Sequence, residues 1–259
     1  MDLGQLLPEP MEKTVAAVTG FCGIAASWGV ERVVAVATSS VRDAANRKEF
    51  LEMIRQRADL DVRVISGDEE AILSYRGVLA GLSLDPAVSV VLDVGGGSTE
   101  LIWQADGQIQ TSSVQVGAVR FTVNNWSEEH VVSLLAPVLD RLKDIPVVRL
   151  AGVGGTITSL AAMEMKLSRY DPRLIHGFYL TSDAIEQLYG KLLSLSLEER
   201  KIMPGLQPAR ADIITGGTAI VRTVLRQTGL EGLTVSESDI LQGLLLEMVM
   251  ANGSTGSST

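Results

Sequence analysis

Three consecutive glycines between two acidic residues are the feature of this sequence most suited to chemistry. In the segment VVLDVGGGSTELIW, the glycines Gly95 to Gly97 follow an apolar stretch at once. Consecutive glycines let the backbone approach a ligand with converging N–H groups, and such an arrangement binds phosphate oxygens. Asp93 precedes the glycines and Glu100 follows them, so both carboxylates could hold Mg²⁺ directly or through its water shell. The alternative is an ordinary hairpin turn, but three glycines are long for that purpose.

A second glycine loop follows another apolar stretch. The segment LAGVGGTITSL places Gly154, Gly155 and Thr156 at the start of a predicted helix. The N-terminus of a helix is a ready site for an anion or a nucleotide. Glycine turns between a strand and a helix also serve packing, and the sequence leaves the two roles equally open.

Two further segments carry charged residues at predicted helix starts. Arg42, in ATSSVRDAANRKEFL, could offer a guanidinium fork to phosphate, although its spacing alone favours an N-capped surface helix. Glu70, in ISGDEEA, lies in a first helical turn, where acids usually complement the helix dipole. Spacing alone therefore assigns Glu70 no chemical role.

The remaining candidates favour structural roles. His130, His176 and the single cysteine, Cys22, have no partner signature around them. One cysteine and two histidines leave too few nitrogen and sulfur donors for a zinc finger, so any metal must bind oxygen ligands. The sequence contains no nucleophile elbow, Walker lysine motif or dinucleotide glycine fingerprint.

The elements that must position these residues alternate along the chain. Apolar β-branched runs alternate with amphipathic helical stretches, which is typical of an α/β fold. Predicted strands span 33–37, 61–65, 88–94, 99–104, 108–116, 147–151 and 232–236. Predicted helices span 43–57, 68–80, 127–143, 156–166, 182–193, 196–203, 209–227 and 239–250.

Local signals refine this pattern. The three strands from 88 to 116 should be consecutive and antiparallel, with Asp106-Gly107 as a hairpin turn. Ser127 is a predicted N-cap, and Ser196 with Glu199 forms a predicted capping box. Pro137 should bend or split the helix that contains it.

Composition limits the class of protein. The chain has 259 residues, enough for one large or two small domains, and 46% of them are hydrophobic, which supports a buried core. A net charge of −9 has the wrong sign for coating DNA or an anionic membrane. The sequence shows no signal peptide and no unbroken apolar run of ~18 residues. We therefore expect a cytoplasmic protein that binds neither DNA nor membrane.

Several segments together resemble the Ppx/GppA family of exopolyphosphatases and guanosine pentaphosphate phosphohydrolases. They occur in the family's order from about Val30 to Glu247: ATSSVRDAANRKEFL, ISGDEEA, VLDVGGGSTEL, VQVGAVRFT, AGVGGTITSLAA, PGLQPARADIITGG and VSESDILQGLLLE. The resemblance implies two ribonuclease-H-like domains facing a cleft, as in actin, sugar kinases and heat-shock chaperone ATPases. It also implies Mg²⁺-dependent hydrolysis of a terminal phosphoanhydride bond, releasing orthophosphate from polyphosphate or guanosine pentaphosphate.

The resemblance also implies roles for individual residues. Glu70 matches the family's general base, and Asp93 and Glu100 match its magnesium-associated acids. The phosphate-binding positions that it implies are Arg42, Gly95, Gly96, Gly97, Ser98, Gly154, Gly155 and Thr156. Phosphoryl transfer needs charge neutralisation and an oriented water, and a glutamate near other acids has a raised pKa that suits a base. We expect the carboxylates of residues 70, 93 and 100 to converge around one divalent ion.

The resemblance further suggests a domain division. Relatives begin with a strand, a phosphate loop of the form Asp-x-Gly-Ser-Asn-Ser and two more strands, which this sequence lacks. We expect a first domain truncated at its N-terminus, formed by 1–68 plus 238–250, a second domain at 69–237 and a disordered tail at 251–259. The truncation should leave an exposed sheet edge and a weak or inactive enzyme, and pairing into a homodimer is expected from relatives.

Two other functions fit the same loops. A non-catalytic regulatory module could bind a nucleotide or polyphosphate without cleaving it. A sugar or acetate kinase shares the superfold, but the sequence carries no acceptor-site signature.

Overall fold

The computed structural model describes residues 4–143, 145 and 149–253, and the chain divides into two compact units. These units are Met1–Glu70 and Ala71–Thr259. The C-terminal segment 238–250, expected with the first domain, falls in the second unit. Its helix packs tightly there, since a Cβ added at Gly243 would lie 1.9 Å from the Leu73 carbonyl oxygen. The division into functional domains stays a prediction.

The first unit is small and built on two parallel strands. Ala35 of β1 (Ala35–Ala37) pairs with Val62 of β2 (Val62–Val64). Its helices are α1 (Pro8–Ser27), α2 (Ser39–Arg42) and α3 (Arg47–Ala58). The core between them contains Met11, Val15, Phe50 and Ile54.

The predicted helix at 43–57 was wrong at its start, because the chain leaves helical geometry between α2 and α3. The side chain of Asn46 explains the break. Its amide accepts a hydrogen bond from Leu6 N–H at 2.8 Å and donates one to Leu6 O at 2.9 Å. This pairing fixes the segment before α3 against the N-terminal chain.

The second unit contains a six-stranded mixed sheet in the order β5-β4-β3-β6-β8-β7. The strands are β3 (Ser89–Val94), β4 (Thr99–Ala105), β5 (Gln108–Val114), β6 (Arg149–Val153), β7 (Tyr179–Thr181) and β8 (Gly232–Val235). The consecutive antiparallel strands β3, β4 and β5 are confirmed, whereas β7 was not predicted. Residues 147 and 148 of one predicted strand lie outside the described residues.

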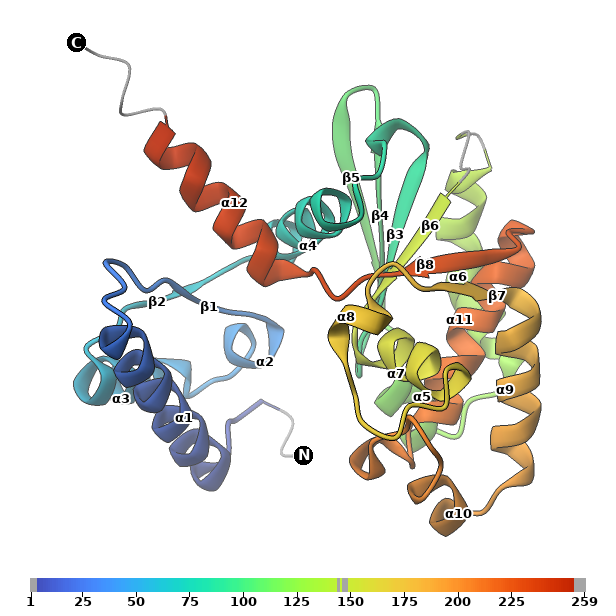
Figure 1. Ribbon diagram of the computed structural model, residues 1–259, viewed down its shortest axis with the longest axis horizontal. Helices are drawn as coiled ribbons and strands as arrows, with labels where there is room; N and C mark the ends of the chain where they lie inside the picture. Colours follow the sequence, from blue (N-terminus) through green and yellow to red (C-terminus); the bar gives the residue numbers. More distant parts are fainter. Residues whose placement is uncertain (1–3, 144, 146–148, 254–259) are drawn as a thin grey trace. The chain divides into compact units, whose positions relative to one another are not determined.

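Helices cover both faces of this sheet (Figure 1). On one face α6 (Glu128–Leu142), α7 (Gly155–Glu164), α9 (Ser182–Ser194) and α11 (Ile214–Thr228) bury Val90, Leu92 and Val94. On the other face α4 (Gly67–Leu82) packs on Val91 and Ile102. Because side chains alternate along a strand, Asp93 projects from the same face as Val91.

Several helix signals are confirmed. The Ser127 hydroxyl accepts a hydrogen bond from His130 N–H, and Ser196 and Glu199 form the capping box of α10 (Leu197–Lys201). Pro137 does not split α6. Leu135, Val138 and Leu139, close to Pro137 in sequence, are buried in the core on the sheet. This packing holds the helix together.

The remaining elements depart from the expected pattern or extend it. The predicted helix at 209–227 is a 3₁₀ turn at Pro208–Arg210 followed by α11. Within the described residues, three short helices were not predicted: α2, α5 (Ala118–Val123) and α8 (Pro172–Ile175). The last helix, α12, spans Ile240–Gly253, and positions 254–259 of the predicted tail lie outside the described residues. In the described part of the chain, no helix is long and apolar enough to cross a membrane.

Candidate functional site

The glycine loop after β3 places two carboxylates side by side. Asp93 pairs directly with Glu100 across β3 and β4, and both residues are half-buried. Directly opposed residues project from one face with Cβ atoms about 4.5 to 5.5 Å apart. Glu100 is fixed further because its Oε1 accepts a hydrogen bond of 2.8 Å from the Ser113 hydroxyl on β5. Two oriented carboxylates thus lie at the base of the loop.

The second glycine loop lies beside the first. β3 and β6 are parallel neighbours with Asp93 opposite Val153, so both strands end at the same edge of the sheet. Gly154 follows with φ of +92°, and a Cβ there would lie 2.7 Å from Asp93 Oδ1. Only glycine allows the loop to approach the carboxylate this closely.

An arginine that we did not single out from the sequence lies over the second loop. A Cβ added at Gly155 would lie 2.1 Å from Nη1 of Arg210, so the half-buried guanidinium rests on the first turn of α7. A cation at the positive end of a helix dipole is unfavourable by itself, and an anion bound between the two would relieve it. The motif PGLQPARADIITGG was the sequence signal that contained this residue.

The hydroxyl of Thr156 faces the interior. The residue is 4% exposed, and a Cβ at Gly217 of α11 would lie 2.8 Å from Thr156 Oγ1. The backbone N–H in the first turn of α7 is therefore the group that Thr156 can offer to an anion.

Tyr170 lies close enough to Arg210 for the guanidinium charge to act on it. Its hydroxyl donates a hydrogen bond to the Glu237 carboxylate. Burial, together with that carboxylate, raises the pKa of Tyr170 to about 12. Tyr170 is therefore a neutral hydrogen-bonding group at neutral pH.

The two histidines have structural contacts. His176 Nδ1 accepts a hydrogen bond of 3.1 Å from Glu237 N–H, and its Nε2 lies 3.1 Å from the Gly81 carbonyl oxygen. The ring of His130 packs edge-on against Trp126.

The other two predicted site residues belong to the first unit. Arg42 lies at the end of α2 and not at the start of the predicted longer helix. Its Nη1 donates hydrogen bonds to Ile65 O at 2.9 Å and to Glu70 Oε2 at 3.2 Å. The structure thus pairs Arg42 with Glu70, whereas the convergence of Glu70 with Asp93 and Glu100 stays a prediction.

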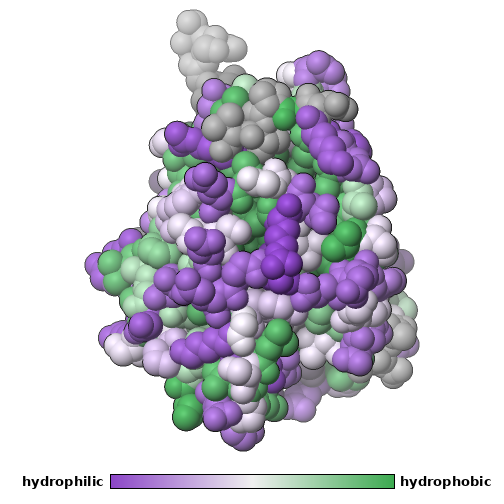
Figure 2. Space-filling model, turned by 90° about the vertical axis from the view of Figure 1, so that its right-hand side faces the viewer, coloured by the Kyte–Doolittle hydropathy of each residue, from purple (hydrophilic) through white to green (hydrophobic). Residues whose placement is uncertain are grey.

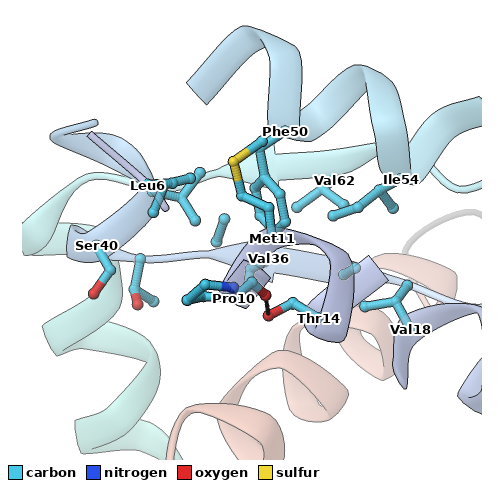
Figure 3. Close-up of a pocket in the computed structure, with 14 residues that line it drawn as sticks. Leu6, Pro10, Met11, Thr14, Val18, Val36, Ser40, Phe50, Ile54 and Val62 are labelled. Carbon is cyan, nitrogen blue, oxygen red and sulfur yellow. Dashed lines mark hydrogen bonds between the residues drawn. The ribbon is translucent and has the colours of Figure 1, made fainter. Parts of the chain in front are cut away.

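The first unit also contains an apolar cavity of about 340 Å³. Figure 3 shows side chains of α1, α3 and both strands gathered around it, including Met11, Phe50 and Val62. Its polar lining consists of hydroxyls and has no charged side chain: Thr14, Thr38 and Ser40. A cavity of this kind cannot neutralise a phosphate, so it is not the candidate site.

The donor set at the paired carboxylates suits a magnesium ion. Within the described ranges, no three or more His, Cys, Asp or Glu side chains group to hold a metal. Mg²⁺ is commonly bound by one or two carboxylates, with water and substrate phosphates completing its shell. Asp93 and Glu100 therefore fit an ion shared with a phosphorylated substrate.

The chain is similar to known proteins in sequence and in structure. The model of the Ppx/GppA phosphatase family matches residues 2–252. Exopolyphosphatase 2 of Mycobacterium tuberculosis is 31% identical over 267 residues, covering 95% of this chain and 83% of that protein. A bifunctional 3-dehydroquinate synthase/phosphatase of Fusobacterium nucleatum is 31% identical over 262 residues, covering 94% of this chain and 39% of that protein.

Solved structures give the same result. The Aquifex aeolicus member of the Ppx/GppA family superposes with a TM-score of 0.84 at 30% identity, covering 97% of this chain and 85% of that chain. An exopolyphosphatase from Cytophaga hutchinsonii gives a TM-score of 0.85 at 24% identity, covering 96% of this chain and 84% of that chain. This second likeness concerns the fold alone.

Proposed function

Because this chain belongs to the Ppx/GppA phosphatase family and has its α/β, actin-like fold, we propose that it hydrolyses the terminal phosphoanhydride bond of inorganic polyphosphate. This proposal rests mainly on one observation. Two glycine loops, two carboxylates and Arg210 lie together at one edge of the second unit's sheet. We propose polyphosphate as the first substrate because one relative is named an exopolyphosphatase. Guanosine pentaphosphate is the second substrate to test.

The loops supply the binding groups. Among the described residues, no protein group accepts a hydrogen bond from the N–H of Gly96, Gly97 or Ser98. These N–H groups are available to phosphate oxygens, as is the first turn of α7 beneath Arg210. The proposed ion is Mg²⁺, which Asp93 and Glu100 would hold and which would neutralise charge on the transferring phosphoryl group.

The proposed reaction needs one base. The water oxygen forms the new bond to the terminal phosphorus, the bridging P–O bond breaks toward the remaining chain, and Glu70 accepts the water proton. We propose that Arg42, through its hydrogen bond to Glu70, orients the carboxylate that takes the proton.

A phosphate-release assay with polyphosphate and guanosine pentaphosphate tests this function. We expect Asp93→Asn to lower release by about 100-fold, because it removes one charge from the proposed ion site while keeping the side-chain shape. Glu70→Ala should lower it by a similar factor. Asp106→Asn is the matched control, since Asp106 is exposed at the β4–β5 turn and Asn tolerates its φ of 51°.

Two outcomes would contradict the hydrolase. If Asp93→Asn and Asp106→Asn changed orthophosphate release equally, the reaction would not take place at Asp93. Saturable binding of either substrate by the unaltered chain without any orthophosphate release would support the regulatory module instead.

A further inference from the structure

The glycine loop after β3 is held by α5 through consecutive carbonyl groups. The N–H of Ala118 donates to Gly95 O at 2.9 Å. The N–H groups of Val119 and Arg120 donate to Gly96 O at 2.9 and 3.1 Å. The first three N–H groups of this short helix therefore all donate hydrogen bonds to the loop.

The third carbonyl is bound by a side chain. Nε of Arg120 donates to Gly97 O at 2.9 Å, and its Nη2 donates to Gln115 Oε1 at 3.2 Å. The donors to Gly95 and Gly96 are backbone N–H groups, which every substitution except proline retains, but their hydrogen bonds weaken when the loop moves. In the part of the chain that the structure describes, the Gly97 anchor depends on the Arg120 side chain alone.

This pattern orients the opposite edge of the loop. In a trans peptide the C=O of one residue and the N–H of the next point in opposite directions. Carbonyls 95 to 97 turned toward α5 therefore turn the N–H groups of Gly96, Gly97 and Ser98 away from it. Glycine loses more backbone freedom on ordering than other residues, so such a loop needs anchors to stay in one conformation.

We infer that Arg120 is a positioning residue for phosphate binding, acting through the Gly97 carbonyl and not by touching the substrate. This inference rests on the proposed function of the loop as a phosphate site. Without the guanidinium, the peptide between Gly97 and Ser98 can rotate, and its N–H leaves the position in which it meets a phosphate oxygen.

The test compares Arg120→Ala and Arg120→Lys with a control, Arg226→Ala. Arg226 is also a surface arginine bonded to a protein oxygen, but it pairs with Glu186 near the end of α11. The measurements on the full chain are amide hydrogen exchange at Ala118 and Val119, the dissociation constant for inorganic phosphate, and kcat and KM for polyphosphate.

Arg120→Ala should speed exchange at Ala118 and Val119, raise the phosphate dissociation constant by about tenfold and raise KM by a similar factor, with little change in kcat. The loop binds phosphate equally in the ground state and in the transition state. Loss of such binding raises KM and leaves kcat nearly unchanged. Arg120→Lys should recover part of each effect, because an ammonium can donate one hydrogen bond to Gly97. Arg226→Ala should change none of them.

Other results would overturn the inference. A merely destabilised variant would have a smaller active fraction, so kcat would fall at unchanged KM. Unchanged exchange, or an absence of phosphate binding by the unaltered chain, would also overturn it. If the unaltered chain binds phosphate but releases none from polyphosphate, the proposed function fails, and the exchange and phosphate measurements still decide the role of Arg120.

Discussion

Gly154 determines how closely the two loops approach each other. Its φ of +92° suits glycine, and its Cα faces the Asp93 carboxylate. Arg210 adds positive charge at the next residue, Gly155. Residues from two loops and a distant 3₁₀ turn thus lie close together, and both backbone conformation and charge matter there.

We expect Gly154→Ala to cost about 1 to 3 kcal/mol of stability, because the new methyl group combines an unfavourable φ with a clash against Asp93. It should also abolish most phosphate release. Urea denaturation and the release assay measure the two effects.

Gly107→Ala is the matched control for this substitution. Gly107 also has a positive φ, of +74°, but nothing lies within 4 Å of the added Cβ. The control should lose about 1 kcal/mol and keep its activity. Equal activity losses in both variants would show that backbone strain alone, and not the contact with Asp93, matters.

At the scale of elements, α5 connects the sheet to the phosphate loop. Its N-cap, Gly117, lies against that loop, since a Cβ there would lie 2.5 Å from the carbonyl carbon and oxygen of Gly96. Both partners are backbone, so neither can move aside as a flexible side chain would. Glycine is required at position 117 because the backbones of α5 and the glycine loop approach each other so closely.

Gly117→Ala should therefore push α5 away from the loop, at a cost of about 1 to 3 kcal/mol, and reduce polyphosphate turnover. Gly190→Ala in α9 provides the comparison, since its added Cβ meets no atom within 4 Å and alanine favours helix. Thermal unfolding should show a lower midpoint for the first variant and an equal or higher one for the second. Full activity in Gly117→Ala would refute the proposed coupling between α5 and the loop.

At the scale of the whole molecule, the chain's charges matter away from the site as well. Figure 2 shows hydrophilic side chains across the face that contains α9. Arg222 of α11, 12% exposed, pairs with Glu128 of α6 and with Glu186 of α9 at 2.7 Å. Arg226 binds the same Glu186 at 2.6 Å. This network ties three helices of the second unit together.

The network predicts a loss of stability in acid. Burial raises the pKa of Glu186, but the hydrogen bonds and charges of Arg222 and Arg226 outweigh burial and hold the pKa below its ordinary value. A carboxyl group with a lowered folded-state pKa stabilises the fold above its unfolded pKa, near 4.5, and this contribution disappears as the pH falls through the folded pKa.

We expect the free energy of unfolding to fall as the pH drops below about 4.5, and Glu186→Gln to make that fall shallower. Urea unfolding at a series of pH values measures both slopes. Glu198→Gln serves as the control, because Glu198 is an exposed acid that pairs only with its helix neighbour Lys201 in the described structure. Identical pH dependence in all three proteins would contradict a role for the network.

The expectations that this chain is weak or inactive and that it forms a homodimer stay predictions. The phosphate-release assay on the unaltered chain tests the first, and rapid turnover would contradict it. Light scattering at the assay concentration tests the second.

Several elements around the candidate site could be predicted from the sequence because their signals are local. Glycine runs, the Asp106-Gly107 turn and the Ser127 cap report backbone preferences of adjacent residues, and the structure confirms the strands and helices around them. Ordered motifs also carried the family resemblance, with Asp93 and Glu100 as its acids. These inferences required no knowledge of which strands become neighbours.

Only the tertiary structure placed the second loop against Asp93 and Arg210 over Gly155. It also revealed α5 beside the glycine loop. The helix predicted from residue 43 begins only at Arg47 in the structure. Each of these depends on contacts between segments that are distant along the chain. Burial of a common core selects such contacts, and the pattern of neighbouring residues does not encode them.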